Sequence, residues 1–272
     1  MACYNQEHPV DQRKLLGIHP HSYCRPLLTG LTGANRFDIQ TDIPATLALR
    51  LRHRELHAAL LTPIDYARDS SDYLIVPDVS VSSQLPNNAI TIHFRKGIRT
   101  VSTLAVNPSS SSEIILATII LAEEFAITPT IIPAAGSLDS LLIRADAALL
   151  VGDDSLRVAS GDLRTIDLVE AWYEMTDLPY VHGIWCGRES DLNAEDIRAL
   201  QEGARAGKAA SGEDAEAPLT AFEFTGTAES TEGLREFLRY AYFHGILPDV
   251  PDLHFYGDAQ SDGADDENLF LN

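Results

Sequence analysis

Short apolar runs alternate with longer amphipathic stretches along most of the chain. Runs of mostly Leu, Ile, Val and Ala residues that end at Gly, Pro, Asp or Asn are typical of buried strands. They predict strands at residues 14–18, 37–43, 58–61, 73–76, 90–94, 101–106, 127–132, 147–151 and 180–185. The stretches between them predict helices at residues 26–30, 44–55, 63–68, 113–125, 138–144, 167–175, 193–210 and 232–244. Strands that alternate with helices favour an α/β fold with parallel strand pairs.

The predicted strands fall into two groups of similar size, which indicates two lobes. We expect the chain to cross between the lobes near residues 90–97 and again near residues 179–186. The first lobe would then be discontinuous, with residues 14–93 and 183–257, and the second would hold residues 94–182. Polar composition and the acids after residue 258 predict flexible tails at residues 1–13 and 258–272. A cleft between two lobes is a preferred place for a small ligand.

The charge of the chain narrows the choice of partners. The formal net charge is −20, from 40 acidic and 20 basic residues. A chain this acidic repels phosphate backbones and anionic membranes, which argues against nucleic-acid and membrane partners. A small carboxylate is still an acceptable ligand, because local amides and hydroxyls outweigh a distant net charge. The sequence also leaves room for a homodimer.

The cysteines and the first residues of the chain indicate the cellular compartment of the protein. Cys3, Cys24 and Cys186 stand far apart and form no CxxC pair. This pattern fits a reducing compartment rather than a disulfide framework. The polar start MACYNQEHPVDQRK has no apolar segment of the kind found in secretory signals. We therefore expect a cytoplasmic protein.

Hydroxyl-bearing residues gather where predicted elements meet. Ser109–Ser112 precede the helix predicted at residues 113–125, where hydroxyls, free backbone N–H groups and the helix dipole could bind a carboxylate. An ordinary helix cap explains the same serines equally well. Ser80, Ser82 and Ser83 could line a site or form a polar strand face or turn. Thr62 ends a buried strand, at the edge where ligands bind in open α/β sheets.

The common catalytic and metal-binding motifs are missing from the sequence. It contains no GxSxG elbow, no GxxxxGK[ST] phosphate loop and no GxGxxG dinucleotide fingerprint. His19 and His21 follow the first predicted strand, but no third metal ligand stands near them. The residues alone therefore indicate neither a metal centre nor a nucleotide cofactor.

The order of four segments is more specific than any single motif. The segments are LLTPIDYARDSSDYLIVPDVSVSS, TLAVNPSSSSEIILATIIL, ADAALLVGDDSLR and DLVEAWYEMTDLPYVHGIW, and LREFLRYAYFHGILPD near the end is compatible with them. Over residues 14–250 the chain resembles the menaquinone-biosynthesis family that includes chorismate dehydratase. The resemblance implies a type II periplasmic-binding-protein-like fold, with a mixed sheet in each lobe. It also implies dehydration of chorismate to 3-[(1-carboxyvinyl)oxy]benzoate on the futalosine route, without a cofactor or metal.

The resemblance also implies functions for individual residues. Ser83 matches a family serine in the cleft, and Tyr23 stands at a position expected to face the substrate. No side chain is an obvious base for the reaction, so His19, His21 and a carboxylate of the substrate itself are all candidates. The residues implied to bind substrate are Thr62, Ser82, Ser110, Ser111 and Ser112. The chain departs from the family pattern at several places. Tyr23 stands where the family commonly has Asn, Gln84-Leu85 replaces an Asp-Gly pair, and His57 replaces a frequent Asp.

Two other functions are compatible with the same residues. One is 1,4-dihydroxy-6-naphthoate synthase, a sister enzyme of the same pathway that shares the fold and binds a carboxylated substrate. The segments VPDVSVSS and LLVGDDSL favour the dehydratase over this enzyme. The other is a non-catalytic protein that captures a small acid, which Tyr23 mildly favours. All three hypotheses share one partner, a small-molecule carboxylate.

Overall fold

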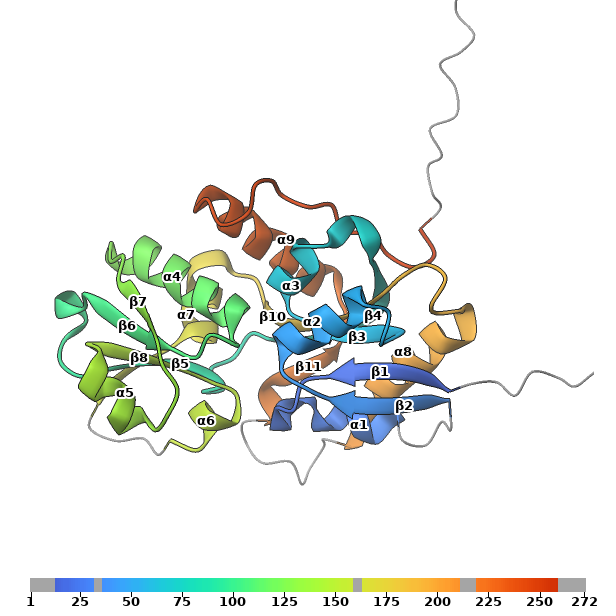
Figure 1. Cartoon of the computed structure of the whole chain (residues 1–272), viewed down its shortest axis with the longest axis horizontal. Helices are drawn as coiled ribbons and strands as arrows, with labels where there is room; N and C mark the ends of the chain where they lie inside the picture. The colour runs from blue at the N-terminus through green and yellow to red at the C-terminus, as the bar shows by residue number, and fades with distance from the viewer. Residues whose placement is uncertain (1–12, 32–35, 159–162, 211–218, 259–272) are drawn as a thin grey trace, which may run out of the picture.

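The chain forms two α/β lobes that lie side by side along its longest axis (Figure 1). The computed structural model describes residues 13–31, 36–158, 163–210 and 219–258. Apart from residues 13 and 258, the expected tails lie outside these ranges, and so does the acidic stretch at residues 211–218. Each lobe is built on one mixed sheet, as the family resemblance implied.

The sheet of the first lobe has six strands in the order β11-β4-β10-β3-β1-β2. The strands are β1 (Lys14–Ile18), β2 (Phe37–Thr41), β3 (Ala58–Leu61), β4 (Leu74–Ser83), β10 (Tyr180–Gly187) and β11 (Phe222–Thr225). β1 pairs in parallel with β2 and β3, whereas β10 runs antiparallel to both β3 and β4. β11 adds an antiparallel edge beside β4. The strand returning from the second lobe therefore lies in the middle of the first sheet.

Helices cover both faces of this sheet (Figure 1). On one face lie α1 (Arg25–Leu31) and α8 (Ala194–Ala210), and on the other lie α2 (Pro44–Arg52), α3 (Pro63–Ala67) and α9 (Ala228–Phe243). Their starts follow from local chemistry: Pro44 occupies the first turn of α2, and Thr62 caps α3. Thr227 and Ser230 form a reciprocal capping box at the start of α9.

The second lobe has five strands in the order β7-β6-β8-β5-β9. They are β5 (Ile90–Phe94), β6 (Thr103–Val106), β7 (Thr130–Pro133), β8 (Ala147–Val151) and β9 (Arg164–Asp167). The helices are α4 (Ser111–Phe125), α5 (Leu138–Arg144), α6 (Asp153–Leu156) and α7 (Leu168–Thr176). β6 pairs in parallel with β7 and β8, while β5 is antiparallel to β8 and β9.

The chain crosses between the lobes earlier than the sequence predicted. Residues 90–93 were expected in the first lobe, but β5 pairs with β8 from Ile90 opposite Val151 to Phe94 opposite Ala147. Residues 180–182 were expected in the second lobe, but β10 already pairs with β4 at Tyr180 opposite Ser83. The crossings therefore lie at residues 84–89 and 177–179, because backbone pairing rather than the apolar pattern decides which sheet a strand joins.

Aromatic side chains join the two lobes on one side of the molecule. Trp172 of α7 packs edge to face against Phe237 and Tyr240 of α9, with ring centroids 5.9 and 5.7 Å apart. Helix α4 also contacts α3 and α9 of the first lobe. The two lobes thus share one continuous apolar core. Within the ranges that the structure describes, no helix is long and apolar enough to span a bilayer.

Candidate functional site

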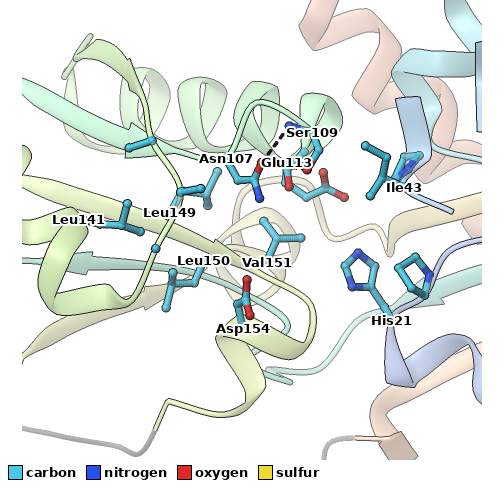
Figure 2. A pocket seen from close by; sticks show the side chains of 16 residues that line it. His21, Ile43, Asn107, Ser109, Glu113, Leu141, Leu149, Leu150, Val151 and Asp154 are labelled. Atoms are coloured by element: carbon cyan, nitrogen blue, oxygen red, sulfur yellow. Dashed lines mark hydrogen bonds between the residues drawn. The ribbon is translucent and has the colours of Figure 1, made fainter. Parts of the chain in front are cut away.

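A cavity of about 160 Å³ lies between the two lobes (Figure 2), and the aromatic residues Trp172, Phe237 and Tyr240 are not part of its lining. The first lobe contributes Pro20, His21, Ile43 and Pro44 to its lining. The second lobe contributes Asn107, Ser109, Ser110, Glu113, Ala134, Ala135, Gly136, Leu141, Leu149, Leu150, Val151 and Asp154. The cavity therefore has a polar end at the start of α4 and an apolar wall formed by β8 and α5.

The turn between β6 and α4 builds the polar end. Asn107 Oδ1 accepts hydrogen bonds from Ser109 N at 3.1 Å and from Ser109 Oγ at 2.9 Å, which fixes the turn. Ser110 is the N-cap residue of α4, yet its side chain makes no capping hydrogen bond. Ser109 and Ser110 both line the cavity at the start of this 15-residue helix, the end at which an α-helix leaves backbone N–H groups without intrahelical partners. A helix start of this kind suits a carboxylate, and this supports the sequence-based interpretation of the serine run.

Glu113, in the first turn of α4, is the residue that sequence reasoning missed. Its side chain is only 4% exposed, and Oε2 is buried without a hydrogen-bond partner. Burial raises the pKa of the carboxyl to about 7; a hydrogen bond from the backbone of Glu113 itself acts in the opposite direction, and repulsion from Asp65 raises the pKa further. Figure 2 shows the carboxyl directed toward the gap between Asn107 and Ile43. Glu113 is therefore a buried carboxyl beside the cavity that ionises only near neutral pH.

His21 brings the first lobe to the opposite side of the cavity. Its ring stacks on Tyr23, with centroids 5.1 Å apart and planes 24° apart. Burial lowers the pKa of the imidazole, although Asp153 and Asp154 act in the opposite direction. Next to it, Ser22 N donates a 2.9 Å hydrogen bond to Asp153 Oδ1 of the second lobe. This bond and the His21 ring hold the lobes together at the cavity.

Gly152 allows this close approach of the lobes. Its φ is +62°, and a Cβ built on it would lie 2.1 Å from His21 Nδ1. Gly152→Ala should therefore lower the free energy of unfolding, both through backbone strain and through overlap with the imidazole. Urea unfolding of the wild type, Gly152→Ala, His21→Ala and the double variant separates the overlap from the backbone strain. We expect the overlap with the imidazole to account for about 1–3 kcal/mol of the lost free energy of unfolding. If Gly152→Ala lowers the free energy of unfolding equally with and without the His21 ring, the ring moves aside and the overlap has no cost.

The three residues predicted to be catalytic lie behind His21, outside the cavity lining. Tyr23 is 1% exposed and stacks on Phe222 at 4.7 Å. Ser83 Oγ lies 2.7 Å from His182 Nε2. His19 is also buried, and desolvation lowers the pKa of its imidazole to about 3. These side chains form a buried layer of aromatic and polar groups that supports the His21 wall, and their catalytic function stays a prediction.

The Ser83 hydroxyl has two buried neighbours that depend on it. Besides its contact with His182, it accepts a 2.9 Å hydrogen bond from Asn87 Nδ2. Ser83→Ala should lower the free energy of unfolding by about 1–3 kcal/mol, because both partners lose a buried hydrogen bond. Ser102→Ala, at an exposed serine, is the control for urea unfolding and should change the free energy by less than about 0.5 kcal/mol. Equal stability of the two variants would contradict this prediction.

The residues predicted to bind substrate are divided between the cavity and its edge. Ser110 lines the cavity. Ser112 Oγ instead accepts a 3.1 Å hydrogen bond from Ile64 N, which ties α4 to α3 across the lobes. The Thr62 hydroxyl donates a 2.8 Å hydrogen bond to the buried carboxyl of Asp65; burial raises the pKa of that carboxyl, although this bond acts in the opposite direction. Ser111 Oγ is buried without a hydrogen-bond partner. Ser82 is buried within β4. Substrate contacts of these other residues stay predictions.

The cavity is poor in positive charge. Among the described residues that line it, none is Lys or Arg, whereas Glu113 and Asp154 are acidic. Over the same described ranges, no group of three His, Cys, Asp or Glu side chains is arranged to hold a metal ion. An anionic ligand would therefore rely on hydroxyls, backbone N–H groups and the dipole of α4.

Comparison with solved structures defines the class of fold. A protein from Archaeoglobus fulgidus is 16% identical with a TM-score of 0.66, over 88% of this chain and 100% of the other. The periplasmic aliphatic sulphonate-binding protein of Escherichia coli is 15% identical with a TM-score of 0.58, over 89% and 95% of the two chains. The ligand-binding component of an ABC-type import system from Staphylococcus aureus has 11% identity and a TM-score of 0.60, with 89% and 94% covered. The chain thus has the two-lobed periplasmic-binding-protein-like fold.

Sequence comparison then identifies the family. A family model described as menaquinone biosynthesis matches residues 15–241. The chain belongs to this menaquinone-biosynthesis family, as the order of its segments predicted. The chorismate dehydratase of Thermus thermophilus is 24% identical over 211 residues, which cover 71% of this chain and 77% of that protein.

Proposed function

We propose that this protein is a chorismate dehydratase, a carbon–oxygen lyase that converts chorismate to 3-[(1-carboxyvinyl)oxy]benzoate. Membership of the menaquinone-biosynthesis family and the similarity to the Thermus thermophilus enzyme support the proposal. The observation that carries it is the interlobe cavity, with hydroxyls and helix N–H groups at one end and an apolar wall at the other. In a small ring with carboxylate substituents, the carboxylates would suit the polar end of the cavity and the ring its apolar wall.

The proposed reaction suits a site of this kind. Loss of water makes the ring aromatic, so the product is strongly favoured and no external energy source is needed. The protein has to bind the carboxylates, help the ring hydroxyl to leave and place a base near the ring proton. Ser109, Ser110 and the N-terminus of α4 would bind one carboxylate, with the ring against Leu150 and Val151.

The volume of the cavity implies that the lobes move during turnover. It is about 160 Å³, whereas typical ligand sites measure roughly 300–1,000 Å³. Chorismate would therefore enter while the lobes are parted, and closure would exclude water and orient the reacting groups. The contacts of His21 and Ser22 with the second lobe would re-form in that step.

Incubation of the full chain with chorismate tests the proposal. We expect a new aromatic product that is lighter than chorismate by one water, detected by chromatography and mass spectrometry. Chorismate that binds without change would indicate a binding protein instead. Turnover of the naphthoate synthase's substrate but not of chorismate would indicate the sister enzyme. Either of these results, or the absence of any binding, would overturn the proposal.

A further inference from the structure

Five exposed basic residues lie together at one end of the second lobe, although the net charge of the chain is −20. Arg95 and Lys96 follow β5, and Arg99 lies in the turn that leads to β6. Arg144 is the last residue of α5, and Arg164 is the first residue of β9. We call these five residues the basic patch. A chain with 40 acidic and 20 basic residues thus presents a local positive surface here.

Strand pairing brings these residues to one place. Phe94, the last residue of β5, lies opposite Arg164 on β9 and opposite Ala147 on β8. Arg95 continues from that point, and its guanidinium donates a 3.5 Å hydrogen bond to the carbonyl of Leu142 in α5. The end of β5, the start of β9 and the end of α5 therefore meet at the basic patch.

The carboxyl of Asp146, just before β8, holds the turn after β5 against this end of the sheet. It accepts a 2.5 Å hydrogen bond from Arg95 Nη2, and bonds of 3.1 and 3.2 Å from the backbone N atoms of Ser102 and Thr103. Arg95 is also the only member of the basic patch that forms an ion pair with a described residue. The other four cations are therefore available to a partner.

Two exposed apolar side chains flank the cations, and the whole patch is remote from the cavity. Ile143 is 79% exposed and precedes Arg144, while Leu163 is 37% exposed and precedes Arg164. The patch surrounds the start of β8, whereas Val151 at the end of that strand lines the cavity. The basic patch therefore suits a separate ligand, one that offers acidic groups beside apolar side chains.

We propose that the basic patch binds residues 265–271 of a second copy of this chain. This segment reads Asp-Asp-Glu-Asn-Leu-Phe-Leu, so three acids are followed closely by three apolar side chains. The acids match the unpaired cations, and the apolar side chains match Ile143 and Leu163. At about 0.1 M salt, charges more than about 10 Å apart are largely screened, so this contact outweighs the repulsion between two acidic chains. The inference does not depend on the reaction that the protein catalyses.

The segment is too short to bring its acids to the basic patch of its own molecule. The chain is held in the first lobe shortly before it, where Phe255 pairs with Ile75 near the start of β4. From there β4 runs about 26 Å to Ser83, and β5 runs about 13 Å further into the second lobe, which lies beside the first along the longest axis (Figure 1). The seven residues from Asp258 to Asp265 span at most about 25 Å. Two antiparallel copies would instead exchange their segments and form a closed two-fold dimer.

Charge reversal on the patch is the first test. The patch variant carries three substitutions, Lys96→Glu, Arg99→Glu and Arg164→Glu. The control variant carries three at exposed arginines of α1 and α8 in the first lobe, Arg25→Glu, Arg198→Glu and Arg205→Glu. In sedimentation equilibrium of the full chain, the wild type and the control should dimerise with dissociation constants within about threefold of each other, and the patch variant at least about 30-fold more weakly. A wild type that stays monomeric at several hundred micromolar would overturn the proposal.

A charge swap identifies the occupant of the patch. The segment variant carries Asp265→Lys, Asp266→Lys and Glu267→Lys, and it should dimerise as poorly as the patch variant. An equal mixture of the two variants should form a heterodimer, because each segment then meets a patch of opposite charge. Loss of the dimer in the patch variant but not in the segment variant would show that another acidic surface occupies the patch. A dimer that persists in the patch variant has its interface elsewhere. Either result, or a mixture that stays monomeric, overturns the proposal.

Discussion

Glu113→Gln is expected to stabilise the folded protein at alkaline pH relative to the wild type. In the unfolded chain this carboxyl should ionise near its ordinary value of 4.5, whereas burial raises its pKa in the folded protein to about 7. Between these values the folded state holds a proton that the unfolded state has lost, so the wild type loses stability as pH rises. The total loss is about 3 kcal/mol above the upper pKa. Glutamine cannot ionise, and the variant should escape this loss.

Urea unfolding of the wild type and the variant at about pH 5 and pH 8.5 measures this difference. The stability of Glu113→Gln relative to the wild type should increase by about 3 kcal/mol between the two conditions. Glu124→Gln serves as the control because that acid is exposed on the same helix. Parallel pH dependence of the wild type and Glu113→Gln would show that Glu113 ionises in the folded protein as easily as in the unfolded chain.

Ser110→Asp is expected to weaken chorismate binding by about 100-fold, because a like charge facing the carboxylate costs several kcal/mol. Ser110 lines the polar end of the cavity, where its side chain makes no capping bond. Aspartate is a good N-cap residue and complements the helix dipole, so the melting temperature should stay constant or rise. The substitution therefore separates ligand binding from folding.

A second helix start in the same lobe provides the control for this substitution. Ser137 is the N-cap residue of α5, it also lacks a capping bond, and it does not line the cavity. Calorimetric titration should find chorismate binding unchanged in Ser137→Asp. Equal weakening in the two variants would indicate a general effect of net charge, and unchanged binding in both would remove the polar end of the cavity from the site.

The sequence predicted best those strands that consist of a single short run of apolar residues. Ala58–Leu61 and Ala147–Val151 are strands within the predicted bounds, because continuous apolar residues are buried on both faces of a sheet. β4 extends to Ser83, well beyond the predicted end at residue 76, since β10 and β11 pair with its serine-rich half. β9 and β11 were missed because short edge strands depend on a partner rather than on their own propensity. In β11, the alternation of the buried residues Phe222 and Phe224 was the available signal.

The candidate site was predictable in part. The serine run before α4 indicated an anion-binding corner, and Ser110 lies there. Glu113 was missed because an acid in the first turn of a helix normally complements the dipole in solvent. Its burial depends on tertiary packing, because α4 packs against α3 and α9 of the other lobe as well as α7 and β8 of its own. Likewise, no local pattern indicates that His182 meets Ser83, since that contact crosses from β10 to β4.

A crystal structure of the protein grown with chorismate tests the central claim most directly, that the interlobe cavity is the substrate site. We expect the ligand between the lobes, with carboxylate oxygens within hydrogen-bond distance of Ser109 and Ser110 and the ring against Val151. A ligand bound elsewhere on the protein, with the cavity between His21 and Ser110 unchanged, would contradict the account.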